Sequence, residues 1–189
     1  MTEIATLQTE RLDMRQLHSG DIDDIALLYG DPMVTRYITG GVHTREMAQA
    51  WLDAQVAFWR RHRRFGMFRV ADRATGAFLG RCGLRDLDDS GEMELGYAFV
   101  PAAWGRGIAT EAARATLDFS FQNSDLDHVA GITFPGNLAS KKVLTNCGFR
   151  YLREDHFYGV DVSYFAISRE ERMTSAGRAR RSGGAAAGV

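Results

Sequence analysis

The stretch WGRGIATEA, residues 104–112, places two glycines one residue apart immediately before a segment that favours helix. The first turn of a helix leaves about four backbone N–H groups unpaired, and the helix dipole adds partial positive charge at that end. Because glycine has no Cβ and tolerates positive φ, Gly105 and Gly107 would let an anion reach those N–H groups. The stretch therefore predicts a phosphate-binding helix start, with a plain tight turn as the alternative.

The order of the predicted elements places this helix start in a mixed sheet. Alternating apolar residues and short turns in residues 66–100 predict an antiparallel meander of three strands. A helix, a strand, a second helix and two final strands follow in residues 105–167, and this crossover makes the strands on either side of the glycine-containing helix parallel. We therefore expect one α+β domain with a mixed, mostly antiparallel sheet. Before the meander we expect a strand at 11–17, a short helix capped by Ser19, and a helix from Thr44 to about Arg63 that buries Met47, Trp51, Ala54 and Phe58.

The bulk composition narrows the classes of partner. The formal net charge of -1 gives no overall attraction to nucleic acid or to an anionic membrane surface. Cys82 and Cys147 lie far apart without the spacing of metal ligands, which is typical of reduced thiols in the cytoplasm. The chain lacks both the ~20 apolar residues of a membrane-spanning helix and a secretory pattern at its amino terminus. We expect a cytoplasmic protein with no membrane partner, no specific nucleic-acid partner and no metal.

The composition changes near residue 171. From Arg172 onward the chain carries four arginines, no acidic residue and almost nothing that could fill a core. Such a segment cannot offset its ordering entropy by burial. The predicted organisation is one domain over residues 1–170 and a flexible Arg/Gly/Ala-rich tail over residues 171–189.

Two common nucleotide-binding motifs do not match the glycine stretch. A dinucleotide-binding loop needs a third glycine where Thr110 stands, and an acidic residue at the end of the next strand. Asp125 and Asp127 lie at a suitable distance but precede that strand. A P-loop needs Gly-Lys-Ser/Thr, which is absent from the stretch. A nucleotide-binding α/β domain is therefore disfavoured, and it ranks behind the two functional hypotheses given at the end of this section.

A second motif makes the pattern more specific. NLASKKVLTNCGF, residues 137–149, opens the helix after the parallel strand and ends it at Gly148. Together with WGRGIATEA, the preceding ELGYAFVP and the opening LQTERLDMRQL, it resembles the GCN5-related N-acetyltransferase (GNAT) superfamily, specifically its ribosomal-protein alanine acetyltransferase (RimJ/RimL)-like branch. The resemblance covers roughly residues 7–168. It implies an acyltransferase, an acetyl-CoA-dependent N-acetyltransferase, whose central parallel strands splay around the cofactor and whose sheet carries helices on both faces.

The resemblance also implies which residues hold acetyl-CoA, the cosubstrate. Backbone groups of Phe99 and Val100, at the strand end, would bond the pantetheine amide or the thioester carbonyl. Asn137 caps its own helix and, by the resemblance, also contacts the pantetheine. Trp104 stands where the superfamily commonly has Gln or Arg, which weakens a side-chain role there. Backbone amides of the glycine loop would bind the pyrophosphate: Gly105, Arg106, Gly107, Ile108, Ala109 and Thr110.

Two residues are candidates for proton transfer. A substrate amine is mostly protonated at pH 7, so a base must accept its proton before the nitrogen attacks the thioester. Glu94 is the candidate base, directly or through a water, with a structural hydrogen bond as its alternative role. Many relatives carry a tyrosine that acts as general acid for the leaving thiolate, at the position where this chain has Leu144. The resemblance implies that Ser140 supplies this acid instead, with an ordinary helix-start role as the equal alternative. Tyr97 is interpreted as a core residue, Glu92 as a solvated one, and a cysteine nucleophile is disfavoured.

The leading hypothesis is acetyl transfer to a primary amine by direct attack in a ternary complex. The acceptor would be a protein N-terminal α-amino group or a small-molecule amine. The second hypothesis is a CoA-binding sensor or regulatory module with the same fold and little or no catalysis. The oligomeric state is open, with a homodimer as one alternative. We expect the acceptor site between segment 31–44, the helix after it and hairpin 156–161, with Tyr37, Trp59, Phe157 and Tyr158 as the nearby aromatic residues.

Overall fold

The computed structural model describes residues 5–38 and 40–174, and in this part of the chain eight strands form one sheet. The strand order is β1-β2-β3-β4-β5-β6-β8-β7. Neighbouring strands are antiparallel except β5 and β6, which are parallel. The predicted α+β fold class, a mostly antiparallel sheet with one parallel pair, is confirmed. The strands are β1 (Thr6–Gln8), β2 (Leu12–Gln16), β3 (Met67–Asp72), β4 (Phe78–Asp86), β5 (Met93–Phe99), β6 (His128–Thr133), β7 (Arg150–Phe157) and β8 (Val160–Ser168).

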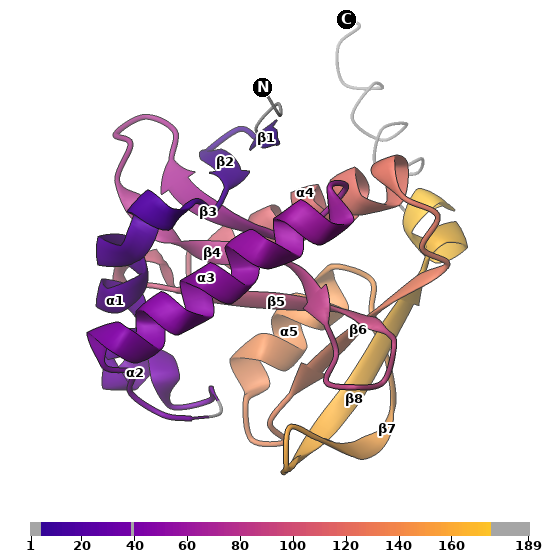
Figure 1. Cartoon of the computed structure of the whole chain (residues 1–189). Helices are drawn as coiled ribbons and strands as arrows, with labels where there is room; N and C mark the ends of the chain where they lie inside the picture. The colour runs from indigo at the N-terminus through magenta and orange to yellow at the C-terminus, as the bar shows by residue number, and fades with distance from the viewer. Residues whose placement is uncertain (1–4, 39, 175–189) are drawn as a thin grey trace, which may run out of the picture.

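Helices cover both faces of the sheet (Figure 1). α3 crosses in front of the sheet with α1 and α2 beside it, and α4 lies behind the sheet. Thr44 caps α3 and Arg63 follows its last turn, which matches the predicted bounds. Within residues 5–38 and 40–174, no helix is both long enough and apolar enough to cross a membrane. The α-helices are α1 (Ile22–Gly30), α2 (Pro32–Thr35), α3 (Arg45–His62), α4 (Ile108–Asn123) and α5 (Leu138–Asn146), with 3-10 turns at Ser19–Asp21 and Pro101–Ala103.

Alternation along the strands divides the apolar side chains between the two faces of the sheet. Met67 of β3 is fully buried in a cluster with Ile25 of α1 and Leu52 of α3. Its neighbour Phe68 meets Phe119 of α4 edge to face, with ring centroids 5.5 Å apart. The core therefore fixes α4 against the sheet, and with it the position of the glycine turn at the start of α4.

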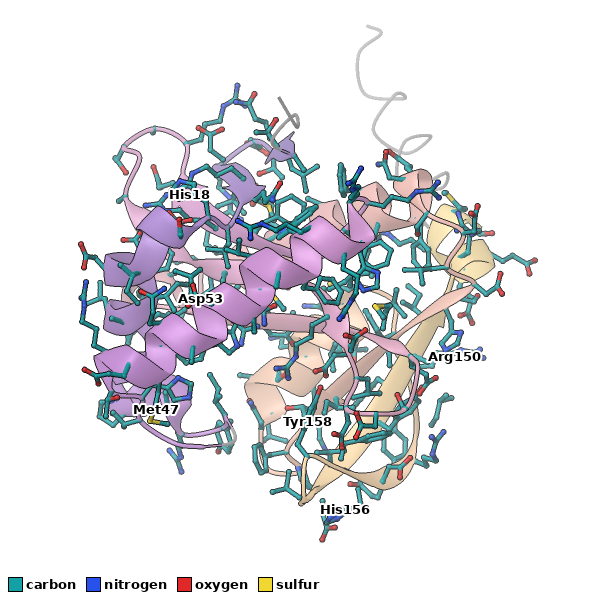
Figure 2. The ribbon with its side chains drawn as sticks, viewed as in Figure 1. His18, Met47, Asp53, Arg150, His156 and Tyr158 are labelled. Atoms are coloured by element: carbon teal, nitrogen blue, oxygen red, sulfur yellow. The ribbon has the colours of Figure 1, made fainter. Side chains whose placement is uncertain are left out.

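The buried face of α3 differs from the predicted one. Phe58 is buried as expected, but Met47, labelled in Figure 2, is 42% exposed. Ala54 is also exposed, and Trp51 is only partly buried. Apolar residues occur on more than one helical face of this segment, so periodicity alone does not choose between them. Packing against the sheet and α1 selects the face that carries Ala48, Leu52, Gln55, Phe58 and Trp59.

The folded domain extends past residue 170, where the sequence analysis ended it. Residues 169–174 are helical. Arg172, assigned to the tail, is 7% exposed and bonds both carboxylate oxygens of Asp118 on α4, each at 2.8 Å. This ion pair attaches the segment to the core, which a composition argument cannot detect. The remainder of the predicted tail, 175–189, lies outside the described residues.

The start of α1 also differs from prediction. Ser19 lies inside the 3-10 turn, which His18 caps because its Nδ1 accepts the N–H of Gly20 at 3.1 Å, and Asp21 stands at the N-cap of α1. Asp21 completes a reciprocal capping box, since its Oδ2 accepts the N–H of His18 at 2.9 Å.

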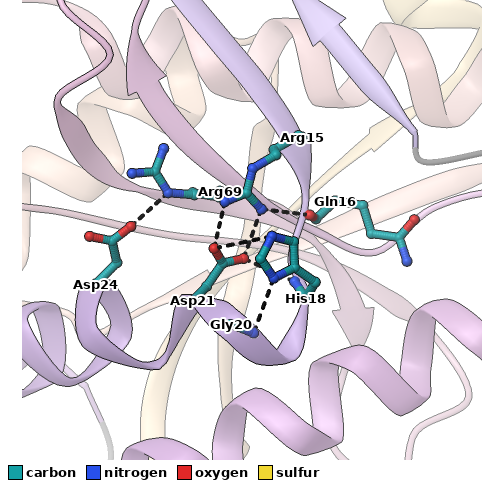
Figure 3. A network of polar contacts seen from close by, with 7 residues as sticks. All are labelled: Arg15, Gln16, His18, Gly20, Asp21, Asp24 and Arg69. Atoms are coloured by element: carbon teal, nitrogen blue, oxygen red, sulfur yellow. Dashed lines mark hydrogen bonds and ion pairs between the residues drawn. The ribbon is translucent and has the colours of Figure 1, made fainter.

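Asp21 also joins this turn to the sheet (Figure 3). Its carboxylate, 4% exposed, receives two hydrogen bonds from Arg15 of β2, at 2.8 and 2.5 Å. One turn later Asp24 bonds Nε of Arg69 on β3 at 2.6 Å. Burial raises the pKa of Asp21, but the hydrogen bonds from Arg15 and His18 lower it by more than burial raises it. The pKa of Asp21 therefore lies below its ordinary value of 3.8.

We predict that Asp21→Asn lowers the free energy of unfolding by about 2 kcal/mol at pH 7, because hydrogen bonds to a buried charged group are lost. Since the folded-state pKa is depressed, this contribution is complete above pH 3.8 and disappears as the pH falls through the folded-state value. Urea denaturation at pH 7 and pH 3 measures it. Exposed Asp53→Asn is the control, expected within about 0.5 kcal/mol of the parent. An equal Asp21→Asn effect at both pH values would contradict the assignment.

Candidate active site

The parallel strands β5 and β6 pair at a single register position, Glu94 opposite Ala130. Beyond that position β5 remains paired with β4 as far as Phe99. β5 leads into α4 and β6 leads into α5, so both helix starts follow the carboxyl ends of these strands. The predicted splay is therefore present, and it leaves one edge of β5 open beside two helix starts.

The glycine turn has the backbone geometry that the sequence predicts. Gly105 and Gly107 adopt φ values of 70° and 76°, in the left-handed region that favours glycine. Among the described residues, no backbone carbonyl accepts a hydrogen bond from the N–H groups of residues 105–110, and Glu111 is the first residue bonded into the helix, to the Gly107 carbonyl at 3.1 Å. These N–H groups and the helix dipole form a site suited to an anion.

An ion pair that the sequence analysis missed holds this turn in place. Arg11, at the start of β2, bonds Glu111 of α4 through Nε at 2.7 Å, and its Nη1 donates to the Arg106 carbonyl at 2.8 Å. Thr9 donates to the same carboxylate at 2.5 Å. Burial raises the pKa of Glu111, but these partners lower it more, so it lies below its ordinary value. Arg11 thus neutralises the carboxylate nearest the helix start, which keeps that start favourable to an anion.

A surface groove of about 890 Å³ lies beside this helix start. Gly107, Thr110 and Arg114 contribute the α4 side, residues 7–11 contribute the wall from β1 and the β1–β2 connection, and Asn146 contributes the end of α5. Its volume lies in the range of small-molecule and cofactor sites. The groove therefore extends the glycine turn into a space of cofactor size.

The end of β5 offers fewer free backbone groups than predicted. The Val100 N–H donates to Leu79 of β4 at 2.9 Å, and its carbonyl accepts the Ala103 N–H at 2.9 Å. Because alternate residues of a strand turn their backbone groups to opposite sides, those of Phe99 face the open edge. The Phe99 carbonyl accepts the Trp104 indole N–H at 2.8 Å, a side-chain role that the sequence analysis did not assign. The Phe99 N–H is therefore the group available to a ligand here, whereas the Val100 backbone is already paired.

The start of α5 brings a serine and a tyrosine together. Asn137 caps the helix, since its Oδ1 accepts the Ser140 N–H at 3.1 Å. The Ser140 hydroxyl lies 2.8 Å from the Tyr97 hydroxyl of β5, so Tyr97 is more than a core residue. Burial raises the pKa of Tyr97, and the Ser140 hydrogen bond offsets only part of that rise. Leu144 is 1% exposed and packs over Gly131, so it belongs to the core.

Glu94 is a buried carboxylate held at one oxygen. It is 2% exposed, and Oε1 receives bonds from Arg85 Nε at 2.5 Å and from the Tyr158 hydroxyl at 2.8 Å. Tyr158 comes from the turn between β7 and β8 (Figure 2), where the sequence analysis placed one wall of the acceptor site. Burial raises the pKa of Tyr158 to about 12, so its hydroxyl remains protonated at neutral pH. Among the described residues none donates to Oε2, which leaves that oxygen for a water or an amine.

The two candidate proton-transfer groups lie on opposite faces of the sheet. Successive strand residues alternate faces, so Glu94 and Tyr97 point to opposite sides of β5. Tyr97 points to the α5 side, where it meets Ser140. The open edge of β5 runs between the two faces. A ligand held in the opening, the space along the unpaired edge of β5, can therefore release a proton to Glu94 on one face and accept a proton from Ser140 on the other.

The expected aromatic residues of the acceptor site divide between surface and core. Tyr37, 38% exposed, lies 6.2 Å from Phe134, centroid to centroid, so the loop after α2 meets the loop after β6. Trp59 is 3% exposed and donates to the Met67 carbonyl at 2.7 Å, so it is a core residue. Phe157 stacks on Tyr164 at 6.1 Å. Of these residues, Tyr158 contacts Glu94, and Tyr37 lies exposed beside the loop that follows β6.

Glu92 is not simply solvated, as the sequence analysis expected. Its Oε1 accepts the Tyr164 hydroxyl at 2.9 Å and lies 2.8 Å from Nε2 of His128. These contacts tie the start of β5 to β6 and β8. They explain the residue structurally and place it just before β5, two residues ahead of Glu94 in the parallel pair.

Both cysteines are buried: Cys82 lies opposite Tyr97 in the sheet, and the Cys147 thiol donates to the Thr110 carbonyl at 3.7 Å. Burial raises the pKa of Cys82 to about 12 and that of Cys147 to about 11. A thiol in this state is a poor nucleophile, in agreement with the expectation that no acetyl-cysteine forms. The described residues also contain no group of three or more His, Cys, Asp or Glu side chains placed to hold a metal ion.

Comparison with known proteins gives one consistent family. The family model described as an acetyltransferase (GNAT) domain matches residues 11–150. "Uncharacterized protein YkkB" of Bacillus subtilis (strain 168) is 32% identical over 152 residues, covering 77% of this chain and 85% of that protein.

Solved structures share the fold. An acetyltransferase from Agrobacterium tumefaciens str. C58 has a TM-score of 0.78 at 24% identity, covering 87% of this chain and 95% of that one. RimL, a ribosomal L7/L12 alpha-N-protein acetyltransferase in complex with coenzyme A, has a TM-score of 0.74 at 15% identity, covering 88% and 98%. These two likenesses concern the fold alone.

We predict that neither cysteine reacts measurably with a thiol-specific reagent in the folded protein at pH 8, because both thiols are buried and protonated. Timed labelling with 5,5′-dithiobis(2-nitrobenzoate), with and without denaturant, measures this. Both thiols should react fully once the chain is unfolded. Rapid reaction of one thiol in the native protein would contradict the assignment and reopen a covalent mechanism.

Proposed function

Because the chain belongs to the GNAT acetyltransferase family, we propose that it transfers the acetyl group of acetyl-CoA to a primary amine by direct attack in a ternary complex. The protein is an acyltransferase of a family that uses acetyl-CoA. The observation that supports the finer proposal is the single-position pairing of β5 and β6 beside the glycine turn. This arrangement offers anion-binding N–H groups and an open strand edge in one place.

In the proposed complex, the chain holds the coenzyme mainly through its backbone. The N–H groups of residues 105–110 bind the pyrophosphate, and Arg106 adds positive charge from the same turn. The Phe99 N–H, at the open edge, donates to the pantetheine or to the thioester carbonyl, where it stabilises charge that develops on oxygen. Asn137 lies at the start of α5 and completes the pantetheine contacts. Acetyl-CoA supplies the activated acyl group.

The proposed reaction uses one proton-transfer group on each face. Glu94 accepts the proton of the acceptor amine through Oε2, directly or by way of a water. The amine nitrogen then forms a bond to the acetyl carbon, and the carbon–sulfur bond breaks. Ser140, held by its hydrogen bond to Tyr97, donates its proton to the departing thiolate, and a solvent water restores the Ser140 proton after release. Arg85 and Tyr158 keep the Glu94 carboxylate in position throughout.

The proposed acceptors are a protein N-terminal α-amino group or a small-molecule amine. The likeness to RimL, named as an alpha-N-protein acetyltransferase, supports the first class. Exposed Tyr37 and hydrogen-bonded Tyr158 would border the acceptor on opposite sides. We further propose a cytoplasmic location, which buried unpaired thiols support, and a homodimer remains one proposed assembly.

We predict that Gly107→Val weakens acetyl-CoA binding by at least about tenfold, because a branched side chain obstructs the approach to the N–H groups. Isothermal titration with coenzyme A measures the affinity. Gly91→Val is the matched control: Gly91 has a similar φ of 80° with open space around it, but lies in the turn at the opposite end of β5. Equal losses of affinity in the two variants would attribute the effect to backbone strain and argue against a phosphate site.

We predict that Glu94→Gln lowers kcat by about 100-fold with little change in acetyl-CoA affinity, because a general base typically contributes at least that factor. Thiol release with a panel of amino acids, peptides and polyamines measures it, and Glu92→Gln, just before β5, is the control, expected near parental activity. Tight coenzyme binding with no turnover of any amine by the parent protein would favour the CoA-binding module instead. Absence of saturable coenzyme binding would refute the proposal.

A further inference from the structure

A guanidinium group without a carboxylate partner lies beneath α1 and α3. Arg81 of β4 is 4% exposed. Its Nε is buried with no hydrogen-bond partner, and Nη1 donates only to Sδ of Met67, at 3.8 Å. Among the described residues no carboxylate lies within ion-pair distance of it. Because buried charges are ordinarily paired, this donor set is suited to an anion that the polypeptide does not supply.

Neighbouring arginines on the same face of the sheet are paired. Arg69 lies opposite Arg81 on β3 and bonds Asp24 at 2.6 Å. Arg85, four residues further along β4, bonds Glu94 at 2.5 Å. Three guanidinium groups therefore face two carboxylates. The excess positive charge is located at Arg81, the most buried of the three.

The surroundings of Arg81 hold its guanidinium in place but leave its hydrogen-bonding needs unmet. The guanidinium carbon lies 5.6 Å from the Tyr29 ring centroid and 5.2 Å from that of Trp51. Rings above a guanidinium contact its face and leave the N–H groups at its edge free to donate. The Tyr29 hydroxyl and Nδ1 of His43, whose ring stacks on Tyr29 at 4.7 Å, are likewise buried without partners. Three unpartnered polar groups in one aromatic cluster indicate a ligand position.

This cluster adjoins the proposed reaction centre. A Cβ atom built on Gly96 of β5 would lie 3.0 Å from Nη1 of Arg81 and 3.6 Å from Nε of Arg85. Gly96 therefore marks the point where the two guanidinium groups converge. Glu94 lies two residues earlier on the same face of the strand, a separation of about 7 Å. An acceptor amine at Glu94 would thus have an unpaired cation within a few bond lengths.

We propose that Arg81, with the Tyr29 hydroxyl, binds a carboxylate of the acceptor, and that the acceptor is a small amine carrying a carboxylate, of the amino-acid class. The inference rests on the proposed function, because it places the acceptor's amine at Glu94. The burial of Arg81 favours a small molecule, since a folded protein's terminus could not bring a side-chain carboxylate to a residue that is 4% exposed. The carboxylate would compensate the unpaired charge.

Matched acceptors test the proposal in the full-length protein. Thiol release is measured with a panel of free amino acids and with their carboxamides, which keep the amine and lose the carboxylate. We expect kcat/KM to be at least tenfold higher for the acids. Equal or faster turnover of the amides would overturn the proposal while leaving amine acetylation intact. Peptides with an internal Asp and an amidated end form a third arm, and faster turnover of these would overturn the small-acceptor assignment.

Variants of Arg81 and Tyr29 provide the second test. Arg81→Met should lower kcat/KM for the acids by about 100-fold and leave the amides within threefold, while Arg45→Met, on the exposed start of α3, should change neither. Tyr29→Phe keeps the ring and should weaken the acids by three- to tenfold, which covers the case in which Arg81→Met does not fold. An unchanged acid-to-amide ratio in folded variants would overturn the assignment.

A binding measurement separates this inference from the proposed function. Trp51 lies beside Arg81, so titration with the preferred amino acid in the presence of coenzyme A should quench its fluorescence in the parent protein and not in Trp51→Phe. Saturable quenching without turnover would support the carboxylate site and refute acetyl transfer. Turnover of amines without any carboxylate-dependent quenching would support acetyl transfer and refute the carboxylate site.

Discussion

Two parallel strands that pair at only one position determine most of this molecule. Parallel neighbours require a crossover, so the chain must leave β5, form α4 on the sheet and return as β6. The splay beyond Glu94 and Ala130 leaves a strand edge unpaired where α4 begins. The pleat of β5 then directs Glu94 to one face and Tyr97 to the other. The departure from regular pairing thus leaves the open strand edge, and the pleat separates the two side chains that we propose take part in proton transfer.

Charge is distributed around this opening in a consistent way. Arg11 neutralises Glu111 beside the glycine turn, and Arg85 holds Glu94 beside the parallel pair. Glu111 and Glu94 thus each have a guanidinium partner. Arg81 is the exception, buried against aromatic rings without a counter-charge. Among the described residues, the other charged side chains that are buried as a whole, Asp21, Glu94 and Arg172, each have an ion-pair partner, so the exception is informative about what binds there.

Local signals in the sequence predicted the parts of the molecule that depend on local physics. The left-handed glycines at 105 and 107, the Asn137 cap and the single parallel pair all follow from residue type and element order. The Tyr97–Ser140 contact and the Arg11–Glu111 pair could not be predicted in this way, because each joins residues 43 or more positions apart. The α3 error has a different cause: apolar residues occupy more than one helical face, and only packing decides between them. The hydrogen bond from Tyr158 to Glu94 likewise depends on how the β7–β8 hairpin packs against β5, which the sequence does not show.

The contacts of Arg11 with Glu111 and with the Arg106 carbonyl couple the β1–β2 connection to the glycine turn, 95 to 100 positions later in the sequence. Arg11 bonds both the Glu111 side chain and the Arg106 carbonyl. A ligand that reorients the glycine turn would therefore strengthen or weaken these hydrogen bonds of the β1–β2 connection. Hydrogen exchange at Thr9 to Leu12 would then report occupancy of the groove, because residues 7–11 form one of its walls.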